Sequence, residues 1–244
     1  MRRRGRRGDR GTRTRGGGRG LRDGPRRAVR AARPGRRGRR AARHAALSRR
    51  RGQEGLLRHY RELAAATSLE TIVYQRDNAV FTPEAVVELA RTDGIIGFKD
   101  GLGDLDLMQR VVSAVRTEVP GDFLYFNGLP TAELTGLAYR GIGITLYSSA
   151  VFCFAPEIAL AFHKALNSGD DATVNRLLDG FYRPFVDLRA QGRGYAVSLV
   201  KAGVRLRGLD VGEVRPPLHE PTEDHVKQLA QLVDRGYALL QEGM

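Results

Sequence analysis

Cysteine and long apolar runs are scarce in this chain of 244 residues. Its one cysteine, Cys153, excludes a disulfide framework and a cysteine-based zinc cluster, and we expect it to be a small buried side chain in an apolar run. The longest uncharged run, Gly141 to Pro156, contains glycine, serine and proline and is too short to span a bilayer. No apolar stretch follows the basic start, so we expect no secretory signal, no membrane partner and a cytoplasmic location.

Lysine and acidic residues are nearly absent from the first part of the chain. Residues 1–53, called the head below, contain 22 arginines, no lysine and two acidic residues. Because the whole chain has 41 basic and 27 acidic side chains, the head carries a net charge of +20 and residues 54–244, the body, carry −6. Apart from Leu21, Val29 and Leu47, the head has almost no large apolar side chain to bury. We therefore expect the head to be disordered.

Three interpretations of the arginine-rich head compete. It would bind nucleic acid if its arginines neutralise phosphates, although it lacks aromatic side chains that stack on bases. A transit peptide would also be rich in arginine, but the head has one serine, Ser48, and no amphipathic period. Runs of arginine, glycine and alanine without lysine are also typical of GC-rich DNA read in a wrong frame. We favour wrong-frame translation as the hypothesis for the head.

The body alternates between strand and helix patterns from about Gln53 onward. Periodicity and capping residues such as Thr82 before Pro83 predict these elements. Strands are expected at 71–74, 94–98, 123–126 and 142–146, with helices at 54–66, 82–91, 104–115, 131–139 and 156–166. Helical patterns at about 171–189, 194–207 and 222–241 complete the chain.

Four consecutive strand–helix units with short connections predict an α/β fold with parallel strands and right-handed crossovers. The strands are apolar throughout, which is typical of a sheet covered on both faces. Such a sheet is either doubly wound or part of an eight-stranded barrel. Gly101 and Gly103 do not complete a dinucleotide-binding pattern, so the barrel is favoured. Its chemistry would lie at the carboxyl ends of the strands.

A lysine and a tyrosine follow two neighbouring apolar strands. Lys99 ends the second strand, where desolvation disfavours the charged form of its amine, as Schiff-base chemistry requires. Tyr74 ends the first strand and would pass protons to and from that amine. In the alternative interpretation, Lys99 pairs with Asp100 or Asp104 at a solvated rim and Tyr74 is a core ring with a solvated hydroxyl.

Polar residues also follow the third and fourth strands. Asn127 and Gly128 end the third, and Ser148 and Ser149 end the fourth. The two serines have neither a nucleophile elbow nor a histidine partner in view, which argues against a serine hydrolase. No pair of histidines has the spacing of metal ligands, so no metal site is expected.

Two segments within Thr71–Asp106 carry a resemblance to a known family. They run Ile-Val-Tyr-Gln-Arg-Asp-Asn-Ala-Val and Gly-Phe-Lys-Asp-Gly-Leu-Gly-Asp, and they resemble the Schiff-base lyase superfamily of dihydrodipicolinate synthase and N-acetylneuraminate lyase. Within it, the residues after Tyr74 and Lys99 are more similar to the family of 5-dehydro-4-deoxyglucarate dehydratases than to the synthases. Segments 194–203 and 214–218 are similar to the same family. The likeness extends from about Gln53 to the C-terminus.

The resemblance implies a reaction and a set of site residues. Lys99 would be the Schiff-base lysine and Tyr74 the proton-relay tyrosine. The substrate pocket would be lined by Asn127, Gly128, Ser148 and Ser149. The implied enzyme is a homo-oligomer that dehydrates and decarboxylates 5-dehydro-4-deoxy-D-glucarate to 2,5-dioxopentanoate, without a metal or an organic cofactor. Alternatives are a related 2-keto acid aldolase or lyase, and a non-catalytic half-barrel with a tail that binds nucleic acid.

The resemblance also implies that half of a barrel is missing. Members of the superfamily have eight strand–helix units, whereas residues 54–168 supply only strands five to eight and residues 169–244 a helical extension. The first four strands, with the threonine pair that holds a substrate carboxylate, would lie where the head is. Wrong-frame translation joined to the correct frame at about residue 53 explains both observations. We therefore expect the chain as written to have little activity.

Overall fold

The computed structural model describes residues 52–242, which lie within one compact unit, Ala45–Met244. The head, with its expected disorder, lies outside the described residues except for Gly52 and Gln53, which belong to a helix at residues 52–65. Gln53 is part of the folded body, because its side-chain Nε2 donates to the Val80 carbonyl at 2.7 Å. In the described part of the chain, none of the helices has the length and apolar character needed to cross a membrane.

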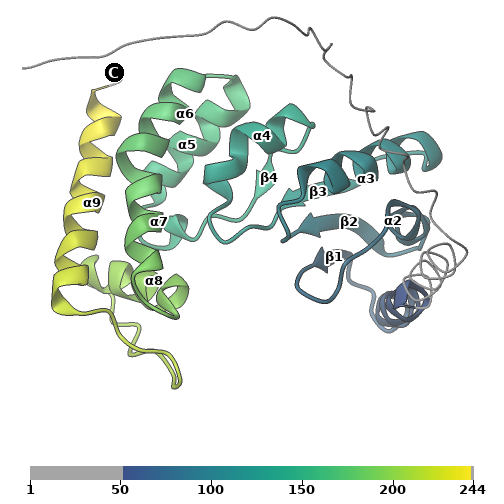
Figure 1. Cartoon of the computed structure of the whole chain (residues 1–244), viewed down its shortest axis with the longest axis horizontal. Coiled ribbons are helices and arrows are strands. Elements are labelled where there is room, and N and C mark those ends of the chain that lie inside the picture. Colours follow the sequence, from purple (N-terminus) through teal and green to yellow (C-terminus); the bar gives the residue numbers. More distant parts are fainter. Residues whose placement is uncertain (1–51, 243–244) are drawn as a thin grey trace, which may run out of the picture. The chain divides into compact units, whose positions relative to one another are not determined.

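Four strands form a single parallel sheet in the order β1-β2-β3-β4 (Figure 1). They are β1 (Thr71–Gln75), β2 (Ile95–Asp100), β3 (Leu124–Asn127) and β4 (Leu146–Tyr147). In the register, Tyr74 is opposite Lys99, and Lys99 is opposite Phe126. The expected α/β class with a parallel sheet is therefore confirmed.

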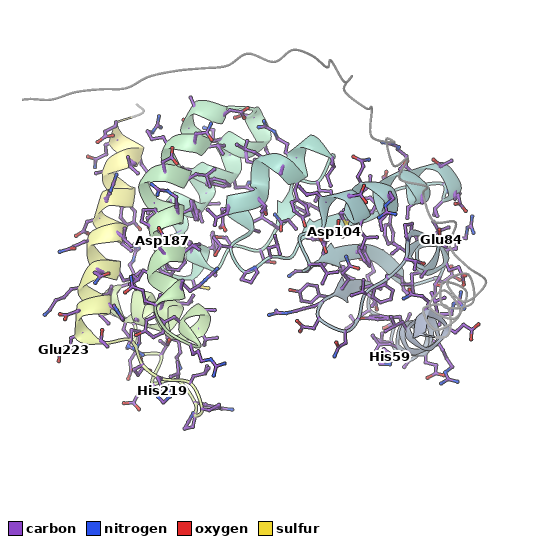
Figure 2. The ribbon with its side chains drawn as sticks, viewed as in Figure 1. His59, Glu84, Asp104, Asp187, His219 and Glu223 are labelled. Atoms are coloured by element: carbon purple, nitrogen blue, oxygen red, sulfur yellow. The ribbon has the colours of Figure 1, made fainter. Side chains whose placement is uncertain are left out.

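Two crossover helices cover one face of this sheet. They are α2 (Pro83–Ala90) and α3 (Leu105–Glu118). Each begins at the expected cap, since Thr82 Oγ1 accepts from an amide in the first turn of α2 and Asp104 Oδ1 does so in α3 (Figure 2 labels Asp104). Val73 and Phe98 point from the strands into the core that these helices close.

The opposite face of the sheet is open in the described part of the chain. Ile72, Leu124 and Leu146 are 40%, 38% and 38% exposed, although they lie on strands. Because successive residues of a strand point to opposite faces, Ile72 shares its face with Tyr74. The expectation that both faces are covered is therefore met for only one face within residues 52–242.

The segment after β3 differs from the expected helix followed by a long strand. A 3-10 turn, η1 (Ala132–Thr135), precedes a short helix, α4 (Gly136–Gly141). Gly143 has a φ of 85°, and the Ile144 amide donates to a carbonyl within α4 at 2.9 Å. These features make the residues after α4 a helix-terminating turn, so the predicted strand at 142–146 was wrong over most of its length.

A helical layer follows the sheet and has a core of its own. After the turn η2 (Val151–Cys153) come α5 (Pro156–Ser168), α6 (Asp171–Leu177), a π-helical segment η3 (Leu178–Tyr182), α7 (Arg183–Ala190), α8 (Tyr195–Leu206) and α9 (Glu223–Gln241). This core includes Phe162, Phe181, Phe185 and Leu199. Cys153 is exposed, contrary to expectation, because Val151 takes the one buried position of η2.

One fully buried carboxylate, Asp100, ties the strand ends to the crossover segments. Its Oδ1 accepts from Gln75 Nε2 at 2.8 Å and from the Leu102 amide at 3.0 Å. Its Oδ2 accepts from the Gly103 amide at 3.3 Å and from the Tyr139 hydroxyl. Burial is the main cause that raises the pKa of Tyr139, and the hydrogen bond to Asp100 raises it further.

Replacing Asp100 should therefore destabilise the body strongly. In Asp100→Ala, two buried donors, Gln75 and Tyr139, and two partly buried amides lose their acceptor, so we expect the free energy of unfolding to fall by about 3 kcal/mol or more. Denaturant unfolding followed by circular dichroism measures this change. Asp106→Ala is the control, because Asp106 forms only an exposed pair with Arg110 on α3 and its loss should have little effect. Equal stability of the two variants would contradict this account of Asp100.

Candidate active site

Tyr74 and Lys99 lie side by side on the open face of the sheet. They are opposite each other in the register of β1 and β2, at the carboxyl ends of both strands. The Lys99 Nζ atom is 4.9 Å from the centre of the Tyr74 ring, within the range of a cation–π contact. The parallel register therefore brings the amine and the phenol to the same edge of the sheet.

Two glycines hold the Tyr74 ring in place. A Cβ added at Gly101 would lie 2.9 Å from Tyr74 Cε2, and one added at Gly128 would lie 2.8 Å from the same atom. The Gly128 position also has no room beside Lys99, whose Cγ would be 2.7 Å from the added carbon. The Tyr74 hydroxyl donates to the Gly128 carbonyl oxygen at 2.8 Å. Only glycine at these positions lets the ring and the lysine stem approach the backbone so closely.

The other expected site residues divide into two groups. Ser148 lies beside the Lys99 amine, and its Oγ accepts a hydrogen bond from Lys99 Nζ at 3.4 Å. Asn127 is buried, and its Nδ2 donates within its own loop to the Ala132 carbonyl at 3.0 Å and to Thr135 Oγ1 at 2.8 Å. Ser149 Oγ accepts from a backbone amide of η2. The structure thus gathers Tyr74, Lys99, Gly128 and Ser148, whereas Asn127 and Ser149 shape the adjacent loops.

The alternative partners of Lys99 are engaged elsewhere. Asp100 points to the opposite face of β2 and is saturated by the donors described above. Asp104 caps α3 through the Leu107 amide. The geometry therefore does not favour a solvated rim pair between Lys99 and either aspartate.

A second group of polar side chains lies where the strand ends meet the helical layer. Glu133 of η1 is 1% exposed, and its Oε1 has no hydrogen-bond partner among the described residues. Burial raises its pKa, and a hydrogen bond from Ser149 and the charge of Arg189 oppose that rise. Burial is the main cause that raises the pKa of Tyr147 and of Tyr182, and the charge of Glu133 raises both further. Neither tyrosine hydroxyl has a hydrogen-bond partner among the described residues. We call Glu133, Tyr147, Ser149, Tyr182 and Arg189 the polar seam.

Arg189 reaches this seam from the end of α7. Its Nη1 donates to Thr131 Oγ1, and burial lowers its pKa while Glu133 raises it. Sequence reasoning missed Glu133 and Arg189, because they come from elements far apart in the chain and no short motif links them. A glutamate in the predicted helix at 131–139 was the one available signal.

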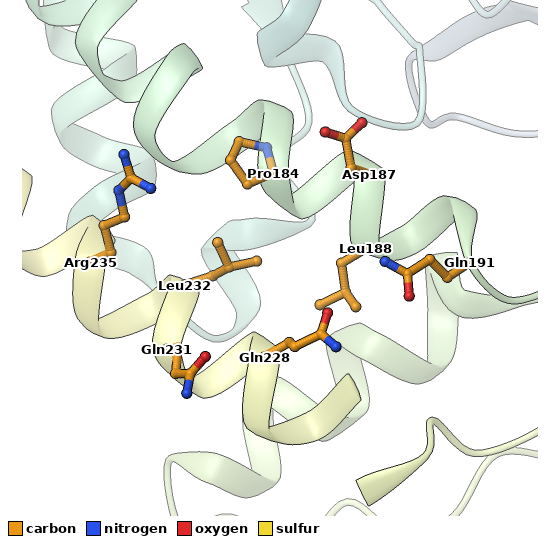
Figure 3. A pocket seen from close by; sticks show the side chains of 8 residues that line it. All are labelled: Pro184, Asp187, Leu188, Gln191, Gln228, Gln231, Leu232 and Arg235. Carbon is orange, nitrogen blue, oxygen red and sulfur yellow. The ribbon is translucent and has the colours of Figure 1, made fainter. Parts of the chain in front are cut away.

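Two hollows lie near these elements. One of about 280 Å³ is lined by Tyr147, Ser149 and His163 together with apolar side chains of η2 and α5. Another, of about 360 Å³, lies between α7 and α9, and Figure 3 shows Asp187 and Arg235 on its rim. Lys99 lines neither of them. Within residues 52–242, no group of three or more His, Cys, Asp or Glu side chains is placed to hold a metal ion.

The fold and the sequence together define the class of protein. The model of the Dihydrodipicolinate synthetase family matches residues 49–235. The chain therefore belongs to this family, which agrees with a TIM-barrel-like α/β fold and a parallel sheet.

Individual relatives have a more specific name. A Streptomyces coelicolor protein named probable 5-dehydro-4-deoxyglucarate dehydratase 1 is 79% identical over 193 residues, which cover 79% of this chain and 61% of that protein. A Rhizobium rhizogenes protein named probable 5-dehydro-4-deoxyglucarate dehydratase is 43% identical over 76% of this chain and 61% of its own length. The chain thus spans about three fifths of these relatives.

A solved structure has a similar fold. The dihydrodipicolinate synthase of Oceanobacillus iheyensis superposes with a TM-score of 0.65 and 25% sequence identity, covering 76% of this chain and 60% of the synthase. The synthase of Thermotoga maritima gives a TM-score of 0.63 at 23% identity and supports the fold alone.

Glu133 should make stability depend on pH. Its folded pKa is raised above the ordinary value of 4.5, so its stabilising contribution is complete below that value and is lost as the pH rises through the folded pKa. Glu133→Gln removes the ionisation, since Arg189, Tyr147 and Tyr182 do not titrate in the same range. The unfolding temperature of the variant should therefore rise relative to wild type between pH 4 and pH 8, as measured by calorimetry. A difference that stays constant across this range would show that the pKa of Glu133 is the same in the folded and unfolded states.

Proposed function

We propose that the body carries the Schiff-base lysine and the proton-relay tyrosine of a decarboxylating dehydratase of 5-dehydro-4-deoxy-D-glucarate. The observation that carries the proposal is the placement of Lys99 Nζ beside the Tyr74 ring at the carboxyl ends of neighbouring parallel strands. The 79% identity to a relative with this name supports the choice of substrate. Homo-oligomerisation, a cytoplasmic location and independence of a cofactor remain predictions.

In the proposed reaction, the Lys99 amine first attacks the ketone beside one carboxylate of the substrate. Loss of water gives an iminium ion, which acidifies the adjacent methylene group. A base, with Tyr74 in its relay, removes a proton from that carbon. The Gly128 carbonyl, which accepts from the Tyr74 hydroxyl, holds the phenol oxygen at the strand end during this transfer.

Elimination and decarboxylation follow on the same nitrogen. The hydroxyl group β to the iminium carbon leaves as water and gives a conjugated iminium. This ion accepts the electron pair of the far carbon–carboxylate bond as CO2 departs. Protonation and hydrolysis then release 2,5-dioxopentanoate and free Lys99, so that one substrate gives one product, one CO2 and one water in balance. The protonated imine serves as the electron sink throughout.

We also propose that the described sheet corresponds to strands five to eight of a barrel. The open face with Ile72, Leu124 and Leu146 supports this assignment, because those side chains would fill the interior of a closed barrel. The chain spans 61% of its 79% identical relative, which is consistent with the absence of a complementary half. The threonines that the family resemblance assigns to substrate carboxylate binding would belong to that half.

Lys99 should form a reducible adduct with a 2-keto acid. Incubation of the chain with pyruvate and sodium borohydride is expected to leave a reduced adduct on the tryptic peptide that contains Lys99. Mass spectrometry can assign the site, because the chain has four lysines, at positions 99, 164, 201 and 227. Lys99→Arg should abolish the adduct although the charge is kept, since a guanidinium group is not a neutral nucleophile at working pH.

The matched control is Lys164→Arg on the exposed side of α5, which should label like wild type. An adduct at Lys164, Lys201 or Lys227 in place of Lys99 would overturn the assignment.

The chain as written should release CO2 from the substrate very slowly. Exposure of a large apolar side chain costs about 1.5–3 kcal/mol, and three such side chains are partly exposed on the open face. Without a second carboxylate-binding group, the substrate would also be poorly oriented, and a misplacement of about 1 Å can cost about 100-fold in rate. The assay compares CO2 release by this chain with release by a version that has an N-terminal half-barrel restored. Comparable turnover would contradict the prediction, and release of an aldehyde without CO2 by the restored enzyme would indicate a 2-keto acid aldolase.

A further inference from the structure

The open face of the sheet carries its side chains in two rows. Residues in register on neighbouring strands form each row: Ile72, Gly97 and Leu124 the first, and Tyr74, Lys99, Phe126 and Leu146 the second. Lys99 is the one charged residue in either row. The face is therefore apolar apart from a single amine.

The first row has a fixed arrangement. A Cβ added at Gly97 would lie 3.0 Å from Leu124 Cβ and 3.5 Å from Ile72 Cγ1, so there is no room for a side chain between the two apolar residues. Ile72 and Leu124 nevertheless remain 40% and 38% exposed in the described part of the chain. A contiguous apolar surface of this kind is typical of a site of association rather than of a face that stays in water.

The sheet also ends in two unpaired edges. Within the described part of the chain, β1 and β4 each pair with one neighbouring strand only. Such edges carry free backbone N–H and C=O groups, which pair readily with another strand. The two edges are complementary, since a two-fold rotation about an axis along the strands brings β1 of one copy beside β4 of another in the parallel direction.

The residues before the body are too few to cover this face as the other half of a barrel. β1 begins at residue 71 and β4 at residue 146, so one strand–helix unit occupies 25 residues. Four such units need 100 residues, whereas the segment 1–51 has 51 residues and almost no large apolar side chains. A second copy of the chain, by contrast, supplies the same two rows and the same two edges.

We propose that a second copy of this chain covers the open face, with the two sheets related by a two-fold axis along the strands. β1 of each copy then lies beside β4 of the other, and the apolar rows of both copies fill one interior. The second copy thereby closes the open side of each Lys99 site. This inference goes beyond the proposed reaction, because a second copy covers apolar surface whether or not Lys99 reacts with a keto acid.

Sedimentation of the full chain, treated with nuclease so that nucleic acid does not link the heads, tests the association. We expect wild type to form a dimer. Ile72→Asp and Leu124→Asp should each raise the dimer dissociation constant at least about 100-fold, because every dimer would then bury two unpaired carboxylates. Both side chains are exposed in the single chain, so circular dichroism should show an unchanged fold.

Two further variants serve as controls. Leu209 is 62% exposed but lies in the loop between α8 and α9, so Leu209→Asp should dimerise like wild type. Lys99→Met should dimerise at least as tightly as wild type, because it removes the one charge from the rows and keeps an unbranched side chain. Substitutions within the same face should therefore act in opposite directions.

A tryptophan reporter identifies the face that becomes covered. The chain has no tryptophan, so Leu124→Trp introduces a single reporter in the first row. Its emission maximum should shift to shorter wavelength as the concentration passes through the dimer dissociation constant, whereas that of Leu209→Trp should not. A monomer in which the Leu124→Trp emission is already shifted at every concentration would show that residues 1–51 cover the face, and would overturn the inference.

The remaining outcomes are also decisive. A monomeric wild type with an unshifted reporter, a dimer that both aspartate variants retain, larger open-ended oligomers, or weaker dimerisation of Lys99→Met would each overturn the inference. The proposed function fails separately. A dimer without a pyruvate adduct at Lys99 refutes the reaction alone, and an adduct in a monomeric chain refutes the second copy alone.

Discussion

The hydrogen-bond saturation of Asp100 is the constraint on which the strand ends depend. Because neighbouring residues of a strand point to opposite faces, anchoring Asp100 within the helix-covered side directs Lys99 to the open side. The same carboxylate fixes Gln75 at the end of β1 and the glycine loop after β2. The amine and the phenol of Tyr74 are therefore placed by a polar network that neither of them joins.

The polar seam couples this sheet to the helical layer by different means. The apolar core of the sheet includes residues from Leu57 to Ile144, and the core of the helical layer begins at Val151. Between them, Glu133 and Arg189 interact through charge, and Arg189 donates a hydrogen bond to Thr131. The boundary between the two apolar cores therefore precedes α5.

Local pattern was sufficient to predict much of the fold and part of the site. Strand and helix order, both helix caps and the adjacency of Tyr74 and Lys99 follow from periodicity and from the parallel arrangement. The extent of β4 could not be predicted in this way. Residues whose side chains favour a strand instead form a helix-terminating turn at Gly143. The partners of Asn127 and Glu133 could not be predicted either, because they depend on tertiary contacts rather than on spacing along the chain.

The separation of the two cores bears on how the described part of the chain should lose structure. Apolar packing couples elements tightly, whereas a seam of hydrogen bonds and charges can exchange its partners for water at a small net cost. Native-state fluctuations should then open the sheet and the helical layer as partly independent units, each with its own amide-exchange protection. The strand-end loops on the sheet side of that boundary would follow the sheet, and Arg189 would follow the helices. The geometry of the candidate site would thus be sensitive to motions that leave both cores intact.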